Sequence, residues 1–279
     1  MRKRPHWIHI ELNYASNAFV GSKTWSSLLL YSDTCHRGLT GLCCVPMKPN
    51  VTLAETMTPN GARMTLVEHD GSFCIRVNGQ QLMHSKVTTS EIKLGTLGCE
   101  RHSAEDLQPK VLIGGLGLGF TLKSVLQTAG PTATVHVVEL FPEIVEWNRT
   151  FMAGLNGDAL KDERVKVLTE DVRSVISRSV QTPYDVIALD IDNNTTAMVK
   201  VENHLLYKKG GVQQIWEALR PGGRAAIWFA AADVAIERLL KKVGFTVQAI
   251  PAKLCGSSKR ETYMIYVADK PLTAAMETK

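Results

Sequence analysis

The sequence predicts a doubly wound α/β fold, in which a mostly parallel seven-stranded sheet follows a small antiparallel β-region. Three observations predict it. Short apolar runs alternate with helical patterns from residue 109 onward. The glycine-rich stretch GGLGLG, at 114–119, joins the first apolar run to the first helical pattern. Over 51–84, apolar and polar residues alternate between turn signals, which is typical of β-hairpins.

The composition is that of an ordinary globular protein. The chain has 279 residues, of which 44% are hydrophobic and 21% are charged. The net charge of +5 is scattered along the chain, so no nucleic-acid partner is expected. No apolar run approaches the roughly 18 residues of a membrane span, so we expect a cytoplasmic protein without a membrane partner. The six cysteines form no CxxC pair, which favours reduced thiols and predicts no metal site.

The first part of the chain reads differently from the rest. Residues 1–46 show no clear hydrophobic period, and our hypothesis is that they are an upstream extension or a poorly ordered arm, with Met47 as the native start. Residues 47–100 are expected to form the small β-region. About three strands are expected over 51–84, separated by the Asn60-Gly61 and Asp70-Gly71 turns.

Strands and helices alternate through residues 101–279, which predicts a Rossmann-like domain. Seven strands are expected over 110–113, 133–140, 164–171, 184–192, 224–230, 245–250 and 262–268. Five helices are expected over 120–129, 142–155, 172–180, 211–220 and 232–244. Pro142 stands at a favoured place near a helix start, whereas Pro221 and Gly244 each end a helix. The helices are therefore expected to cover both faces of the sheet.

The glycine stretch predicts a ligand site at the carboxyl edge of this sheet. Gly115 and Gly117 fit a dinucleotide fingerprint, but Phe120 stands where the third small residue belongs. No lysine-serine pair follows, so a phosphate-binding P-loop is not indicated. Glu139 ends the second strand, where an acid can accept hydrogen bonds from both ribose hydroxyls. These features favour a nucleoside without phosphates, of which S-adenosylmethionine is the common one. The alternative is a tight turn that binds nothing.

Five motifs in order resemble the spermidine synthase family, which consists of aminopropyltransferases built on the class I methyltransferase fold. The motifs are KVLIGGLGLGFTLKSVL, VHVVELFPEIVE, RVKVLTEDV, YDVIALDID and LRPGG, and the resemblance covers about 50–268. It implies a role in polyamine biosynthesis, with S-adenosylmethionine or its decarboxylated form as co-substrate. It also implies that Gly115, Gly117 and Gly119 cradle the nucleoside.

The resemblance gives three acids specific roles. Glu139 would hold the ribose, Asp171 would face the adenine amino group, and Asp190 would be the catalytic acid/base. Each has a structural alternative, because Glu139 ends a strand, Asp171 precedes a helix as a potential N-cap, and Asp190 precedes a loop.

Four further residues are candidates for contact with the acceptor substrate. They are Asp192, Asn193, His204 and Tyr207. The last two lie in ENHLLYKKGG, at 202–211, which is expected to cover the pocket. The alternative is a surface loop in which Leu205 and Leu206 pack inward.

The sequence departs from the family where the diamine would bind. Leu118 replaces an aspartate of the glycine loop, Asn193 replaces the second acid after the fourth strand, and Leu82 falls at a glutamine of the β-region. A dication needs paired carboxylates. Lys208 and Lys209 near the pocket mouth would instead suit an anionic or zwitterionic acceptor.

We therefore expect a spermidine-synthase-like transferase that moves an aminopropyl or other alkyl group to a small, altered acceptor. A small-molecule methyltransferase is the enzymatic alternative, and a non-catalytic nucleoside-binding protein is the other. The assembly state is left open, with a homodimer among the options.

Overall fold

The computed structural model describes residues 49–102, 108–191, 201–254, 256 and 261–272. These residues lie in one compact unit, Met47–Lys279. The expectations for residues 1–46, Asp192 and Asn193 fall outside the described residues.

The small β-region is a four-stranded antiparallel sheet with the strands in chain order. Its strands are β1 (Val51–Met57), β2 (Arg63–His69), β3 (Ser72–Val77) and β4 (Gln80–His84). The expected three strands become four because Asn78-Gly79 makes a further hairpin turn. Asn78 and Gly79 have φ angles of 48° and 81°, and both central residues of a tight hairpin turn need positive φ.

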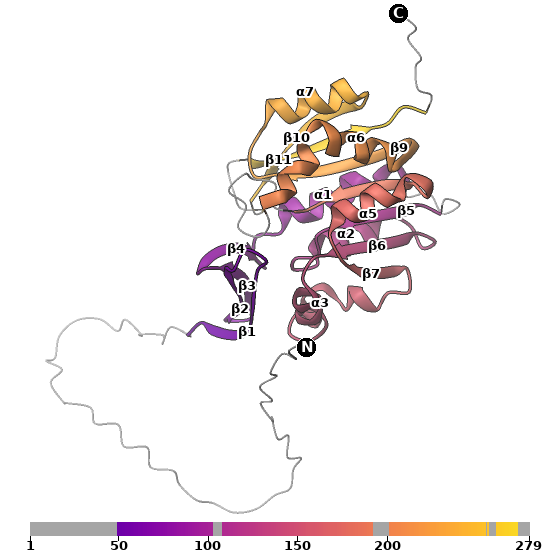
Figure 1. Cartoon of the computed structure of the whole chain (residues 1–279). Helices are drawn as coiled ribbons and strands as arrows, with labels where there is room; N and C mark the ends of the chain where they lie inside the picture. Colours follow the sequence, from indigo (N-terminus) through magenta and orange to yellow (C-terminus); the bar gives the residue numbers. More distant parts are fainter. Residues whose placement is uncertain (1–48, 103–107, 192–200, 255, 257–260, 273–279) are drawn as a thin grey trace, which may run out of the picture. The chain divides into compact units, whose positions relative to one another are not determined.

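The large sheet has the predicted seven strands and confirms the expected fold class (Figure 1). The strands are β5 (Lys110–Gly114), β6 (Thr134–Glu139), β7 (Val165–Thr169), β8 (Tyr184–Leu189), β9 (Leu219–Phe229), β10 (Thr246–Lys253) and β11 (Glu261–Asp269). Their spatial order is β10-β11-β9-β8-β5-β6-β7. Strands β5 to β9 are parallel to one another, whereas β11 runs antiparallel to both β9 and β10.

Helices cover both faces of this sheet. The α-helices are α1 (Thr89–Cys99), α2 (Phe120–Thr128), α3 (Pro142–Arg149), α4 (Ala153–Asn156), α5 (Val172–Arg178), α6 (Lys209–Glu217) and α7 (Val234–Val243). Short 3₁₀ helices are η1 (Glu100–His102), η2 (Ala159–Lys161), η3 (Ser179–Gln181) and η4 (Val201–Tyr207). Side chains of α2 and α3 pack on one face, and side chains of α5, α6 and α7 pack on the other. None of the described helices has the length and apolar character needed to cross a membrane.

Two of the expected helices differ from the sequence-based expectation. The segment 142–155, expected as one helix, divides into α3 and α4. Helix α6 ends at Glu217, before Pro221, because β9 already begins at Leu219.

Helix α1 was not expected, and the sequence had placed 89–99 in the β-region. Gly95 and Gly98 weaken the helical pattern of this segment, which is why the sequence does not predict the helix. They also allow α1 to pack closely on its neighbours. A Cβ on Gly95 would lie 2.7 Å from Ser124 Cβ of α2. Leu94 packs with Ala226 and Ile265 of the large sheet, so this helix belongs to the core of the Rossmann-like domain.

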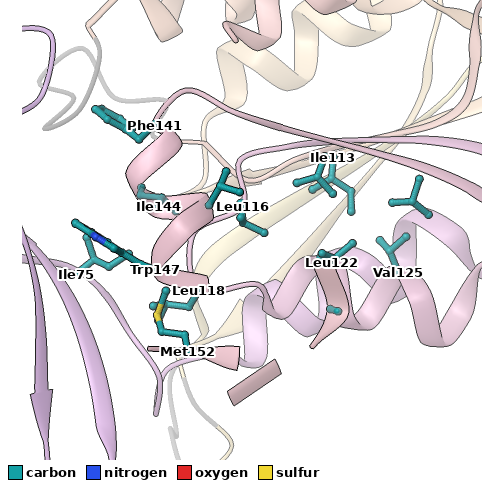
Figure 2. Packing of buried hydrophobic residues seen from close by; sticks show 14 of the residues in the cluster. Ile75, Ile113, Leu116, Leu118, Leu122, Val125, Phe141, Ile144, Trp147 and Met152 are labelled. Atoms are coloured by element: carbon teal, nitrogen blue, oxygen red, sulfur yellow. The ribbon is translucent and has the colours of Figure 1, made fainter. Parts of the chain in front are cut away.

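Alternation along the central strand divides the core into two layers. Val111 and Ile113 point to the face covered by α2, and Leu112 points to the opposite face. In Figure 2, Leu122 and Val125 of α2 lie on the same side of the sheet as Ile113. This packing fixes the end of β5, from which the glycine loop departs.

Strands β5 and β8 are neighbours at the point where the strand order reverses. Gly114 pairs with Leu189, and the backbone N–H of Asp190 donates to the Gly114 carbonyl at 2.8 Å. In doubly wound sheets, ligands bind outside the carboxyl ends of the strands at this point.

Candidate functional site

The loop after β5 has a backbone that only glycine adopts without strain. Gly115 and Gly117 have φ angles of 92° and 52°. A Cβ on Gly115 would lie 2.3 Å from the backbone oxygen of Asp190, and one on Gly117 would lie 2.6 Å from the Met83 sulfur. The first contact is with backbone and the second with a flexible side chain, so Gly115 is the more constrained position.

Two asparagines hold the loop from behind, and the sequence analysis missed both. Asn148 of α3 donates through Nδ2 to the Gly117 carbonyl at 2.8 Å, and Asn156 of α4 donates to the Leu118 carbonyl at 3.1 Å. Asn156 also donates to Asn148 Oδ1 at 2.8 Å. Gly119, with φ of 84°, leaves room for this pair, since its Cβ would meet Asn156 at 2.3 Å. Nothing in the sequence pattern distinguishes these side chains from ordinary helix-surface residues.

Glu139 lies at the end of β6 and is 6% exposed. Its Oε2 accepts from the Leu116 N–H at 2.9 Å, and its Oε1 accepts from the Phe141 N–H at 3.0 Å. Burial raises the pKa of Glu139, and the backbone hydrogen bonds oppose that rise. The carboxylate therefore fixes the glycine loop before any ligand arrives. Each carboxylate oxygen retains a second lone pair, with which it can accept a ribose hydroxyl.

A pocket lies over the glycine loop, and we call it the loop pocket. It is lined by Met64, Ile75, Leu82, Met83, Gly115, Gly117, Val138, Glu139, Leu140, Phe141, Ile144, Glu170, Asp171, Val172, Asp190, Ile191 and Asn203. The predicted Glu139, Asp171 and Asp190 are thus brought together with two of the three predicted glycines. The cavity measures about 90 Å³, well below the roughly 300–1,000 Å³ of typical ligand sites. A nucleoside therefore needs Met83 to move away from Gly117, and methionine is the most adaptable apolar side chain.

The charged side chains among the described lining residues of the loop pocket are all acids, and two of them, Asp171 and Glu170, are paired with Arg173 and Arg178. Four of the described lining residues are acids and none is a lysine, arginine or histidine. Asp171 accepts from the Arg173 N–H at 2.9 Å and forms an ion pair with the same arginine at 2.7 Å. It is therefore the N-cap of α5 as well as a wall residue. Such a wall suits a cationic ligand and opposes a pyrophosphate.

Asp190 follows the last residue of β8 and is half-buried. Its Oδ2 accepts from the Thr121 hydroxyl of α2 at 2.6 Å. Burial raises the pKa of Asp190 to about 6, although the Thr121 hydrogen bond lowers it. An acid with such a pKa can exchange a proton near neutral pH.

Glu91 of α1 is a second acid at this place, and its role was missed because α1 was not expected. Burial, followed by the charge of Asp190, raises the pKa of Glu91 to about 7. The Ser90 hydroxyl donates to Glu91 Oε2 at 2.8 Å and opposes that rise. Glu91 and Asp190, which we call the acid pair, therefore titrate as one unit.

A second hollow adjoins the acid pair, and we call it the acid-pair cavity. It has a volume of about 520 Å³, within the range of ligand sites. Its lining comprises Gln80, Gln81, Leu82, Met83, His84, Val87, Ser90, Glu91, Asp190, Ile191, Trp228, Ala230 and Tyr263. Asp190 lines both this cavity and the loop pocket. The acid expected to carry the chemistry thus lies at the junction of the two.

The segment 202–211 reaches the loop pocket, but not through the two residues that the sequence pattern singles out. Tyr207 is buried in the core with its ring edge-on to Phe229, at a centroid distance of 5.1 Å, which favours a packing role over substrate contact. His204 is half-buried, and neither His204 nor Tyr207 is among the described lining residues of the two hollows. Leu206 packs inward, but Leu205 is 46% exposed. Asn203, which the sequence analysis did not single out, lines the loop pocket instead.

The lysines of this segment lie elsewhere. Lys208 lines a surface hollow together with Arg173 and Arg178, and Asp171 lines both this hollow and the loop pocket. Lys209 is exposed at the start of α6. The expected positive charge at the pocket mouth is therefore replaced, among the described lining residues, by the negative acid pair.

Comparisons with known proteins establish the class of fold. No family description matches the sequence, and no curated protein matches it. The structure is similar to that of spermidine synthase from Thermotoga maritima, with a TM-score of 0.60, 16% identity, and 80% of this chain and 74% of that chain covered. A spermidine synthase in complex with the transition-state analogue AdoDATO gives the same score and identity, covering 80% and 73%.

A methyltransferase is also similar in structure. Human methyltransferase-like protein 13 in complex with SAH has a TM-score of 0.51 and 20% identity, with 67% of this chain and 82% of that chain covered. The chain thus has the fold shared by spermidine synthases and class I methyltransferases, and the fold that the sequence resemblance implied is confirmed.

Proposed function

We propose that this protein is a transferase that binds a sulfonium nucleoside in the loop pocket and transfers its aminopropyl group to a small amine. The observation that carries the proposal is the position of Asp190, which lines both hollows and shares its electrostatic environment with Glu91. An amine acceptor must lose a proton to become a nucleophile, and a carboxylate at the junction can accept it.

The loop pocket supports a nucleoside ligand. A glycine loop with positive φ, a buried acid at the end of β6 and an acid after β7 lie around one cavity. The AdoDATO and SAH complexes of the two structural neighbours support a ligand of this class in the same fold.

The charge of the wall favours the decarboxylated co-substrate. Intact S-adenosylmethionine carries a carboxylate beside its ammonium and sulfonium groups, whereas the decarboxylated form carries only the two cations. The described lining residues of the loop pocket include four acids and no basic side chain. Arg173 and Arg178 balance two of these acids, and the remaining negative charge opposes the carboxylate that only the intact form carries.

The proposed reaction is a single displacement. The ammonium group of the acceptor gives a proton to the acid pair, and its nitrogen lone pair then attacks the aminopropyl carbon bonded to sulfur. The new C–N bond forms as the C–S bond breaks, and the electron pair of that bond stays on sulfur. The products are an N-aminopropyl amine, the neutral thioether methylthioadenosine and one proton. The protein's main contribution is to hold both reactants in line.

Methyl transfer is the second candidate, favoured by the similarity to the methyltransferase bound to SAH. The same pocket and the same displacement would then act on the methyl carbon of the intact co-substrate.

Calorimetric titration of the wild-type protein with both co-substrates tests the proposal. We expect the decarboxylated form to bind more tightly than intact S-adenosylmethionine, and NAD not to bind. Preference for the intact form would shift the proposal to methyl transfer. Absence of binding by either sulfonium nucleoside would refute both candidates.

A further inference from the structure

The acid-pair cavity has a charge pattern that a diamine does not match. Its two acids, Glu91 and Asp190, both line the cavity, and the Thr121 hydroxyl lies 2.6 Å from Asp190 Oδ2 and 3.4 Å from the backbone oxygen of Glu91. The other described lining residues carry no acid. An ammonium group removed from water needs a paired charge, and these residues supply one such place.

Another residue of the wall, His84, lies near two cations. His84 lines the cavity, and burial together with the charges of Lys86 and Arg76 lowers its pKa, so its imidazole is neutral at pH 7. The same two cations oppose a second ammonium group near this part of the wall.

Two aromatic rings form another part of the wall. Trp228 of β9 and Tyr263 of β11 are half-buried, and their ring centroids lie 5.0 Å apart with a tilt of 55°. The charge of Glu91 contributes to a raised pKa of Tyr263, after the larger effect of burial, which places this ring near the acid pair. Aromatic walls favour flat apolar partners.

We infer that the acceptor is a primary monoamine with an uncharged, aromatic far end: its ammonium group meets Glu91 and Asp190, and its ring lies against Trp228 and Tyr263. This inference rests on the proposed function for the transfer step but not for the binding step. The volume of about 520 Å³ accommodates a ligand of this kind.

The test measures the direct binding of three amines to the wild-type protein by calorimetry at pH 8, without co-substrate. The probes are 2-phenylethylamine, butylamine and 1,4-diaminobutane. We expect phenylethylamine to bind about tenfold or more tightly than butylamine, because its ring buries additional apolar surface. Diaminobutane should bind most weakly, because its second ammonium group finds no further acid among the described lining residues of the acid-pair cavity. Any other order, including a lead for diaminobutane or no binding of any amine, overturns the inference.

Two variants test whether the preference for phenylethylamine over butylamine depends on the ring of Trp228. Trp228→Leu keeps an apolar side chain but removes the ring, and it should bring the ratio of phenylethylamine to butylamine affinity close to one. Phe151→Leu removes an aromatic ring that is 43% exposed and does not line the cavity, and it should leave that ratio unchanged. An unchanged ratio in Trp228→Leu would place the ring of the amine elsewhere and contradict the inference.

Binding and transfer can fail separately. If the three amines bind in the expected order but the protein binds no sulfonium nucleoside, the proposed function fails and the assignment of the cavity stands. If the nucleoside binds and diaminobutane alone is converted, the proposed function stands and the assignment is wrong.

Discussion

The loop pocket and the acid-pair cavity are built in opposite ways. In the loop pocket, the Glu139 carboxylate accepts hydrogen bonds from backbone N–H groups, and the loop carbonyls accept from Asn148 and Asn156. In the acid-pair cavity, the charge of Asp190 raises the pKa of Glu91. Each acid accepts one side-chain hydrogen bond, Glu91 from Ser90 and Asp190 from Thr121. The polar groups of the first site are held by hydrogen bonds within the protein, whereas the two acids of the second raise each other's cost of ionisation. Acids with raised pKa values that lie together in a hollow are candidates for reacting groups.

The largest effect that separates the two regions is expected from Asp190→Asn. This change keeps the shape and removes the base, so turnover with an amine should fall by about 10²–10⁴-fold. Nucleoside affinity, measured by calorimetry on the same variant, should change by less than about threefold. Loss of nucleoside binding together with turnover would mean that Asp190 belongs to the loop pocket alone.

Thr121→Val sharpens this test. The Thr121 hydrogen bond lowers the pKa of Asp190, so its loss should raise that pKa further. The alkaline-rising limb of the wild-type pH–rate profile, expected near the values of about 6 and 7 for the acid pair, should move to higher pH in this variant. A limb at the same pH would show that another group accepts the proton.

Glu139→Ala should weaken nucleoside binding by one to two orders of magnitude, because two charge-assisted hydrogen bonds, worth roughly 1.5–3 kcal/mol in all, are lost. It should also lower the melting temperature, since the buried N–H groups of Leu116 and Phe141 lose their acceptor. Calorimetry and thermal unfolding measure the two effects. Glu170→Gln, which changes an acid on the same wall that pairs with Arg178, is the control and should bind almost normally. Equal affinities in the two variants would place the ribose elsewhere.

Alanine substitutions at three glycines should lower the free energy of unfolding by different amounts, according to what each added Cβ would contact. Gly115→Ala should destabilise the protein by about 1–3 kcal/mol more than Gly157→Ala, because overpacking against the Asp190 carbonyl adds to the cost of positive φ. Gly157 has φ of 70° with no neighbour within 4 Å, so it measures the cost of the backbone conformation alone. Gly117 meets the movable Met83, so Gly117→Ala should fall between the two, and Gly117→Val should impair nucleoside binding more than Gly117→Ala. Equal unfolding free energies for all three alanine variants would mean that the loop is an open turn.

The smallest of the expected effects is that of Glu91→Gln on the free energy of unfolding, which should depend on pH. The pKa of Glu91 is raised from 4.5 to about 7, so the folded protein binds more protons than the unfolded chain between these values. Stability from this group is therefore present at low pH and is lost as pH rises through about 7. The full rise of the pKa corresponds to roughly 3 kcal/mol, and burial of the neutral glutamine amide offsets most of it. Glu91→Gln should therefore be more stable than wild type at pH 8 by about 1 kcal/mol, or about 2–4 °C in melting temperature. The exposed Glu163→Gln serves as control, and the same gain in both variants would contradict the burial of Glu91.

Sequence patterns could predict the loop pocket because its parts follow strand ends. Gly115, Gly117, Glu139 and Asp171 each occupy a position that the alternation of strands and helices identifies. The acid-pair cavity could not be predicted in the same way. Glu91 lies on a helix whose glycines hide its period, and Trp228 and Tyr263 are brought together only by the antiparallel pairing of β9 with β11. Tyr207 shows the converse, since its position in a polar loop suggested substrate contact but its ring packs on Phe229.

The most direct test of the central claim is the amine-dependent release of methylthioadenosine from decarboxylated S-adenosylmethionine by the wild-type protein. We expect methylthioadenosine release that requires an amine, rises with pH as the acid pair ionises, and is lost in Asp190→Asn. Tight binding of the decarboxylated nucleoside with no release for any amine, or release that is equal in wild type and Asp190→Asn, would contradict it.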